Sequence, residues 1–251
     1  SKDSNLPIDL GLWIGGDLQE NNLEIQRALE ILKKYPNRIQ SVIVGNEVLL
    51  RKELEPLELY AYIDFMKSHT KKPVTTAETW DIWEKNPQLA SHVDFLTIHI
   101  LPYWEKVPIE RYNEFIIEKY SVVEELFPNR KIVIGETGWP RHGYNNNKAV
   151  PSIKNQAQAI RGFVNLAHEK GWHYNIIETL DQPWKGYEEG NVGQYWGIFT
   201  TDRALKFQLA GEVELNKYWL YQVIAAIIIG ALLTIFGLKN QRVNISHGFA
   251  Y

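Results

Sequence analysis

The sequence predicts a parallel α/β fold: a (β/α)8 barrel, or TIM barrel, that lacks its first two βα units in this chain and is followed by one C-terminal transmembrane helix. Three observations lead to this prediction. Short apolar runs alternate with amphipathic stretches, which is the pattern of βα units. Polar and acidic residues gather where the apolar runs end, and a long uncharged run follows the last unit.

Six short apolar runs are the expected strands. Each run is apolar almost throughout, which is typical of parallel strands that are covered on both faces. Polar turns at 38–41 and 129–131 lead into two of them. In chain order, the expected strands are Ile8 to Ile14, Ser41 to Val48, Val74 to Ala77, Val93 to Ile100, Lys131 to Glu136 and His173 to Thr179.

Five amphipathic stretches between these runs are the expected helices. Pro56 and Ser152 stand where a helix start is favoured, Pro because it needs no backbone N–H partner there and Ser because it caps. The expected helices are Leu23 to Lys34, Pro56 to Ser68, Pro87 to His92, Ile109 to Phe127 and Ser152 to Lys170. Strands that alternate with helices in this way form a parallel sheet.

Two closures of such a sheet compete, a doubly wound sheet and a barrel. A doubly wound sheet carries a glycine-rich turn after an early strand, and Gly11, Gly15 and Gly16 do not have that spacing. A barrel gathers functional residues at the carboxyl ends of several strands, and five expected strand ends carry them here. These residues are Glu47, Glu78, His99, Glu136 and Glu178.

The number of expected strands falls short of a closed barrel. Such a barrel has eight strands, and six are counted before the C-terminal uncharged run. The sequence also begins at Ser1 without an initiator methionine or a signal peptide. We therefore expect that two βα units and an export signal precede this sequence in the whole protein.

Composition argues for a neutral substrate. The formal net charge of the 251 residues is −3, and acidic and basic residues interleave, so no charged block indicates nucleic acid. The chain has 9 Trp and 13 Tyr, and their flat amphipathic rings suit the apolar faces of sugars as well as protein cores. There is no cysteine, no HExxH and no EF-hand spacing. We expect neither a metal nor a cofactor.

The C-terminal run is the expected transmembrane helix. Tyr218 to Leu238 has no charged residue over 21 positions, which is long enough to span a bilayer. A buried core helix is the alternative, but core helices of this length seldom lack a polar face. Lys239 and Arg242 follow the run, which places that side in the cytoplasm and the barrel outside, at the cell membrane.

This run sets the expected domain division. Residues 1–210 form the barrel domain, 211–217 a linker, 218–238 the transmembrane helix and 239–251 a short tail. Because the sequence stops soon after the helix, the tail could also begin a further membrane part.

Two glutamates stand in similar contexts at the ends of two expected strands. The run SVIVGNEV ends at Asn46-Glu47, and KIVIGETGWP carries Glu136. A glycosidic bond is cleaved by such a pair, since one carboxyl protonates the leaving oxygen and the other attacks or activates water. A separation of about 5 to 5.5 Å, which two strands of one barrel can give, predicts retention of configuration. The alternative for either glutamate is a salt-bridged or capping carboxylate.

The two roles require different environments. Glu47 must be protonated when the leaving oxygen departs, so we expect surroundings that raise its pKa. Glu136 must be ionised to attack, so we expect hydrogen-bond donors that favour its charge.

Five motifs, in this order, resemble glycoside hydrolase family 17. They are GNEVLLR at 45–51, TTAETW at 75–80, HILPYWE at 99–105, GETGWPRHG at 135–143 and YWGIF at 195–199. The likeness extends over residues 6–210 and is greatest to the bacterial and archaeal membrane-attached members.

This resemblance implies a metal-independent retaining hydrolase or transglycosylase that acts on β-1,3-linked glucan. It implies Glu47 as acid/base, Asn46 as a contact of the sugar 2-hydroxyl and Glu136 as nucleophile. Ile8 to Ile14 matches the third strand of the family, so its first two strands, which contribute to the sugar site, have no counterpart here.

Other side chains at strand ends are candidates for binding the sugar, each with a structural alternative. His99 and Glu78 are as compatible with a structural hydrogen bond or ion pair as with a contact to sugar. Aromatic side chains in the loops are candidates for orienting the nucleophile and for stacking. The remaining candidates are Tyr103, Trp104, Trp139, Glu178, Asp181 and Trp184.

Three functions remain open at this point. The first is an enzyme that cleaves or rearranges β-glucan at the cell surface. The second is a non-catalytic glycan-binding or scaffolding barrel, which would have no need of a carboxyl pair. The third is an accessory domain of a membrane protein for polysaccharide synthesis or export.

Overall fold

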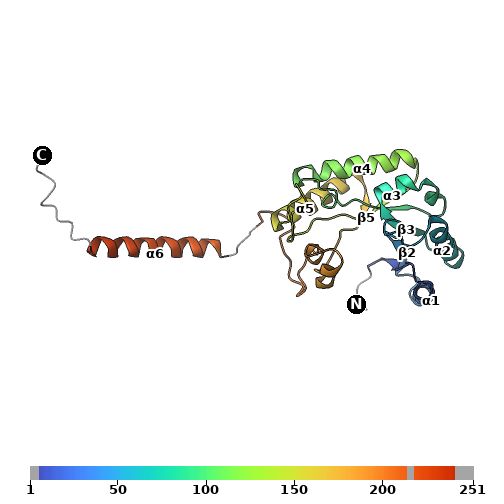
Figure 1. Cartoon of the computed structure of the whole chain (residues 1–251), viewed down its shortest axis with the longest axis horizontal. Helices are drawn as coiled ribbons and strands as arrows, with labels where there is room; N and C mark the ends of the chain where they lie inside the picture. The colour runs from blue at the N-terminus through green and yellow to red at the C-terminus, as the bar shows by residue number, and fades with distance from the viewer. Residues whose placement is uncertain (1–5, 214–217, 241–251) are drawn as a thin grey trace, which may run out of the picture. The chain divides into compact units, whose positions relative to one another are not determined.

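The computed structural model describes residues 6–213 and 218–240, with the side chains of 238–240 excepted. The chain forms two compact units, Ser1–Gly211 and Glu212–Tyr251. The first is an α/β unit, and the described residues of the second include one helix, as Figure 1 shows. Part of the expected linker and most of the expected tail lie outside the described residues.

The first unit is built on one sheet of six parallel strands in the order β1-β2-β3-β4-β5-β6. Sequential order with helical crossovers is the βα pattern that the sequence predicts. Among the described strands, β1 and β6 each pair with one neighbour, so the sheet is a half-barrel. The strands are β1 (Ile8–Leu12), β2 (Ile39–Asn46), β3 (Val74–Thr79), β4 (Leu96–His99), β5 (Ile132–Glu136) and β6 (His173–Tyr174).

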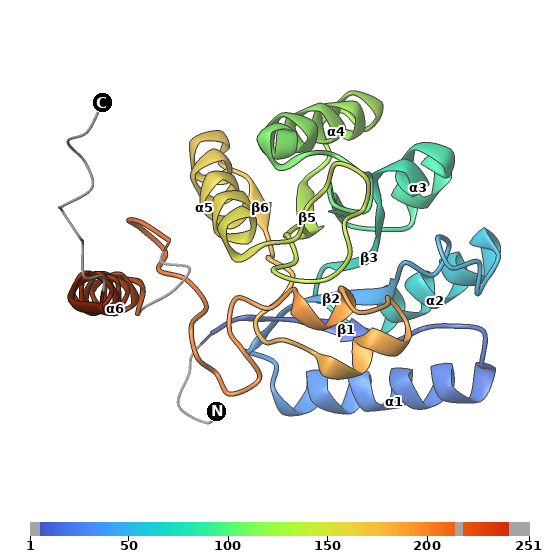
Figure 2. The same cartoon turned by 60° about the vertical axis from the view of Figure 1, so that its left-hand side comes forward.

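The crossover helices lie around the outside of this curved sheet (Figure 2). They are α1 (Leu18–Lys34), α2 (Pro56–His69), α3 (Trp80–Lys85), α4 (Tyr112–Leu126) and α5 (Ile153–Lys170). Four 3-10 turns complete the unit: η1 (Pro87–Ser91), η2 (Ile109–Arg111), η3 (Pro183–Tyr187) and η4 (Gly193–Tyr195).

The two middle strands of the sheet are buried on both faces. All four residues of β4 and the first five of β3 are buried, because helices cover one face of the sheet and side chains fill the other. Between sheet and helices the largest buried side chains include Trp83, Met66 and Phe163. This core holds the carboxyl ends of the strands in place.

Several boundaries differ from those expected from the sequence. Helix α1 begins five positions early, because the Asp17 side chain accepts hydrogen bonds from the amides of Gln19 and Glu20 and caps it. Helix α3 was not expected, and the expected helix at Pro87 to His92 is only a 3-10 turn. Strand β6 ends at Tyr174 rather than Thr179, although the Ile177 amide still donates to the Thr137 carbonyl.

The second unit contains α6 (Trp219–Asn240), one continuous helix. Residues Trp219–Gly237 have a mean hydropathy of 2.2, and none of this span is buried. Length and composition are therefore sufficient for a membrane span, as expected for Tyr218 to Leu238.

Candidate active site

Glu47 stands immediately after β2 in a left-handed backbone conformation, with φ of 54°. This conformation is uncommon outside glycine and is held here by hydrogen bonds on both sides of the residue. The Glu47 amide donates to the Ala77 carbonyl at 2.7 Å, and the Arg51 amide donates to the Glu47 carbonyl at 2.9 Å. The turn thus fixes the direction of the Glu47 side chain.

A glycine precedes this segment and another precedes Glu136, for steric reasons. Gly45 has φ of +83°, and a Cβ there would lie 2.5 Å from Val48 Cγ2. A Cβ on Gly135 would lie 2.5 Å from Thr97 Cγ2 and 2.9 Å from the His99 ring. No side chain fits at Gly135, because the imidazole occupies that space.

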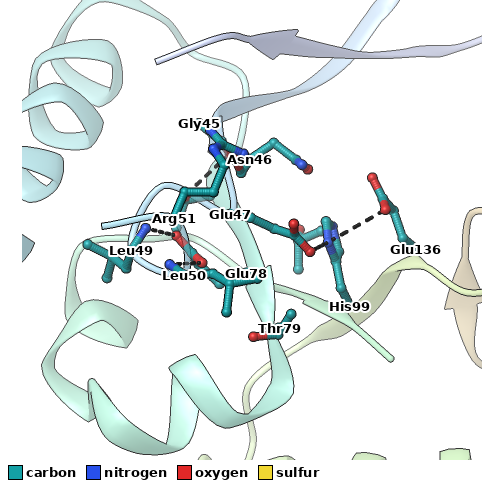
Figure 3. Close-up of polar contacts among 12 residues, drawn as sticks. Gly45, Asn46, Glu47, Leu49, Leu50, Arg51, Glu78, Thr79, His99 and Glu136 are labelled. Carbon is teal, nitrogen blue, oxygen red and sulfur yellow. Dashed lines mark hydrogen bonds and ion pairs between the residues drawn. The ribbon is translucent and has the colours of Figure 1, made fainter. Parts of the chain in front are cut away.

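His99, at the end of β4, lies between the two glutamates (Figure 3). Its Nδ1 is 3.1 Å from Glu47 Oε1 and 3.8 Å from Glu136 Oε2. These two carboxylate oxygens are therefore at most about 7 Å apart, the sum of these distances, a bound that is compatible with the separation of about 5 to 5.5 Å in retaining enzymes. The structure brings the expected pair together around one imidazole.

Charge and burial compete within this triad. Burial opposes a charge on His99, but the carboxylates of Glu136 and Glu47 outweigh it and raise the His99 pKa. Burial raises the pKa of Glu136, while the charge on His99 works in the opposite direction. We expected hydrogen-bond donors to favour the charged form of Glu136, and this expectation is wrong, because the net effect of its surroundings is to raise the Glu136 pKa. The main opposite charge near Glu136 is His99.

Glu78 lies beneath the Glu47 turn rather than in the open site. Its side chain is fully buried and accepts hydrogen bonds from the amides of Leu49 at 2.8 Å and Leu50 at 3.3 Å, as Figure 3 shows. Burial raises the Glu78 pKa to about 7. The side chain thus supports the turn that carries Glu47.

The pair faces a cavity of about 1330 Å³ at the carboxyl ends of the strands. This volume exceeds that of an ordinary small-molecule pocket and suits an oligosaccharide. Five of the residues that we expected from the sequence line it: Asn46, Glu47, His99, Trp104 and Glu136.

Tyr103 and Trp139 are core residues instead. Both are fully buried, and their rings pack edge to face, 5.7 Å apart. The Tyr103 hydroxyl donates to the Tyr144 carbonyl at 2.6 Å, and the Trp139 indole donates to the Val150 carbonyl at 3.0 Å. Neither polar group is turned toward the glutamates, so these aromatics support the wall to which Trp104 belongs.

The three sugar-binding candidates after β6 do not line the cavity either. Glu178 is paired with Lys185 at 2.9 Å, and Lys185 rather than Glu178 lines the cavity. Asp181 is buried in ion pairs with Lys206 at 2.5 Å and with an arginine of the 135–143 loop. Trp184 is 63% exposed and does not line the cavity.

Most of the lining residues were not among the candidates from the sequence, and two tryptophans and two charged residues are examples. Trp13 and Trp80 come directly after β1 and β3, so their position at strand ends was an available signal. Lys185 and Glu189 stand in the irregular segment after β6, where no periodicity indicates them. Within residues 6–213 and 218–240, no three His, Asp or Glu side chains are grouped to hold a metal ion.

A parallel half-barrel with two glutamates in a tryptophan-lined cavity at its strand ends is the arrangement of a (β/α)-barrel glycosidase. Within that class, the chain belongs to the BtgE/BtgC glycoside hydrolase domain family, whose model matches residues 1–197. This confirms the predicted glycoside hydrolase family.

Relatives with curated descriptions support family 17. The probable family 17 glucosidase SCW4 of Saccharomyces cerevisiae is 25% identical over 80% of this chain. The probable beta-glucosidase btgE of Aspergillus fumigatus is 30% identical over 65%. The chain spans 53% of the first protein and 30% of the second. Both relatives are fungal, so they do not support the expected bacterial or archaeal type.

Solved structures agree with the fold. The glycoside hydrolase family 17 beta-1,3-glucanosyltransferase of Rhizomucor miehei has a TM-score of 0.72 and 27% identity, over 80% of this chain and 74% of that one. An active-site mutant of the Rhizomucor miehei enzyme in complex with laminaritriose has a TM-score of 0.73 and 26% identity over the same shares.

Proposed function

We propose that this protein is a retaining glycoside hydrolase or transglycosylase that acts on β-1,3-linked glucan. The observation that carries the proposal is the approach of Glu47 and Glu136 to one His99 nitrogen, at 3.1 and 3.8 Å, in a cavity large enough for an oligosaccharide. Substrate class follows from the names of the relatives, which include glucan 1,3-beta-glucosidases and a beta-1,3-glucanosyltransferase.

The proposed mechanism uses the two glutamates in succession. Glu47 gives its proton to the glycosidic oxygen while a Glu136 oxygen attacks the anomeric carbon, so the carbon–oxygen bond breaks and a glucosyl ester forms. Glu47, now ionised, takes a proton from water or from an acceptor hydroxyl, whose oxygen then displaces Glu136. Two inversions give net retention. A non-catalytic binding barrel would have no use for this arrangement.

Retention is tested by the anomer that forms first. The full chain, incubated with an aryl β-glucoside or a β-1,3-glucan oligosaccharide, is expected to release β-anomeric product before mutarotation, as proton NMR resolves it. An α-anomer formed first would exclude the double displacement. No product from either substrate would exclude the proposed hydrolase.

Attachment to a membrane is the second part of the proposal. We propose the division into a barrel domain at 1–210, a linker at 211–217, the span at 218–238 and a tail at 239–251, with the barrel outside the cytoplasm. It is supported by the length and hydropathy of Trp219–Gly237.

The anchor is tested by alkaline carbonate extraction of cell membranes. The full chain is expected to stay in the membrane pellet. Replacement of Ile228 and Ile229 by arginine is expected to release most of it, because each arginine costs about 2.5 to 3.5 kcal/mol at the centre of a span. Ile228→Leu is the control and should stay bound. Recovery of the unaltered chain in the supernatant would contradict the anchor.

A further inference from the structure

The end of β1 carries an exposed tryptophan in the same cavity as the two glutamates. Trp13 is 61% exposed, and it lines the cavity together with Asn46, Glu47, Leu50 and Arg51. An exposed indole inside a cavity, rather than on an open convex surface, indicates a ligand with flat apolar faces.

The indole is held by a cation. The Arg51 guanidinium lies over the Trp13 ring at 4.6 Å from its centroid. Glu53 fixes that guanidinium with two hydrogen bonds, from Nε at 3.0 Å and from Nη2 at 2.9 Å. These bonds lower the Glu53 pKa, so the pair stays charged. The ring therefore has a fixed support and little orientational freedom left to lose on binding.

The same support connects the indole to the catalytic turn. Arg51 Nη1 also donates to the Asn46 carbonyl, one residue before Glu47. The segment after Trp13 packs closely against the turn as well, since a Cβ on Gly15 would lie 2.9 Å from Glu53 Oε2. Trp13, Arg51 and Glu53 thus form one unit with the backbone that positions the proposed acid.

The position of this unit decides which sugar it contacts. In sheet order, Glu136 is on β5, Glu47 follows β2 and Trp13 follows β1, the neighbour of β2 on the side away from β5. The acid protonates the departing oxygen, so the departing sugar lies on the Glu47 side. The same space later receives the acceptor.

We infer that Trp13, on its Arg51–Glu53 support, forms an acceptor subsite that stacks on a glucosyl unit and favours transfer over hydrolysis. The inference rests on the proposed function. An acceptor held by stacking competes better with water for the glucosyl ester, because its effective concentration beside Glu47 is raised.

The experiment has a transfer arm and a binding arm, both on the full chain in detergent. In the first, an aryl β-glucoside is the donor and β-1,3-linked glucobiose the acceptor, and the ratio of transfer product to released glucose is measured. Trp13→Ala is expected to lower this ratio about five- to tenfold. Trp13→Phe keeps a smaller ring, so its transfer ratio should lie between those of the unaltered chain and of Trp13→Ala.

The second arm needs no turnover. In a Glu136→Gln background, calorimetric titration with β-1,3-linked glucotetraose is expected to give about five- to tenfold weaker binding when Trp13→Ala is added. Tyr35→Ala is the matched control, because Tyr35 is also an exposed ring, 46% exposed, with a cation over it at 5.3 Å, and does not line the cavity. It should change neither readout.

The outcomes separate this inference from the proposed function. An unchanged transfer ratio and unchanged tetraose binding in both Trp13 variants would overturn the subsite while the enzyme remains active. Equal losses of transfer and hydrolysis, with a lower melting temperature and unaltered binding, would make Trp13 a packing residue. If the unaltered chain lacks activity, the proposed function fails, and the binding arm still decides the subsite.

Discussion

Replacing Glu136 by alanine is expected to abolish retaining turnover, with a loss in kcat of about 10⁴-fold or more, since no other group takes the place of a nucleophile. Replacing Glu47 is expected to be less severe on a donor with an activated aryl leaving group, which departs with little protonation. Its first step should persist, and glucosyl ester should accumulate because no general base activates water.

Azide distinguishes the two variants by stereochemistry. In Glu47→Ala, azide attacks the anomeric carbon of the ester, releases Glu136 and gives β-glucosyl azide, because the anion needs no general base. In Glu136→Ala, azide in the vacated space displaces the aryl alcohol once and gives the α-azide. Product anomers are identified by proton NMR. Glu114→Ala is the control, because Glu114 is 66% exposed and paired with Arg111.

One result would reverse the assignment. If Glu136→Ala gave β-glucosyl azide, a covalent ester would still form in it, and Glu47 would have to be the nucleophile. If azide rescued neither variant and both kept full activity, the pair would not be catalytic.

The sequence was sufficient for the sheet and for the glutamate pair, for a physical reason. Apolar segments that alternate with amphipathic helices predict parallel strands in sequential order. The carboxyl ends of parallel strands all lie at the same edge of the sheet. Glu47, His99 and Glu136 each end or follow a strand, so their meeting follows from topology alone.

The sequence could not predict in the same way which loop side chains are buried and which line the cavity. Tyr103 and Trp104 are adjacent in the sequence, yet the first is fully buried and the second lines the cavity. Both are aromatic residues of one loop, and the local sequence contains no signal that distinguishes a residue that lines the cavity from a buried residue that packs behind it. Trp13 was overlooked because the expected strand ran to Ile14, whereas β1 ends at Leu12 and leaves the indole beyond the sheet.

The direction in which the Glu136 pKa is shifted could not be predicted from the sequence either. The expectation for Glu136 came from what a nucleophile must do, whereas burial, which depends on every neighbouring side chain, raises its pKa. The structure assigns much of the compensation to His99, which is 1% exposed and was equally compatible with a structural role. The charge on this histidine has a measurable consequence.

Replacing His99 by alanine is expected to move the acid limb of the pH profile of kcat/KM to higher pH and to lower kcat/KM on that limb by about 100-fold. Glu136 must be ionised to attack, and the positive charge of His99 lowers its pKa against the effect of burial. Removing that charge raises the Glu136 pKa further, so ionisation needs a higher pH. The profile is measured with an aryl β-glucoside.

Two variants separate this charge from packing. His99→Asn retains a polar group near the ring position but no charge, so it should recover part of the rate above the limb and keep the shifted limb. His92→Ala removes a histidine that pairs with Asp64 at 2.9 Å and does not line the cavity, so its profile should match the unaltered chain. An unmoved limb in both His99 variants would show that the imidazole positions Glu47 without holding the nucleophile in its ionised form.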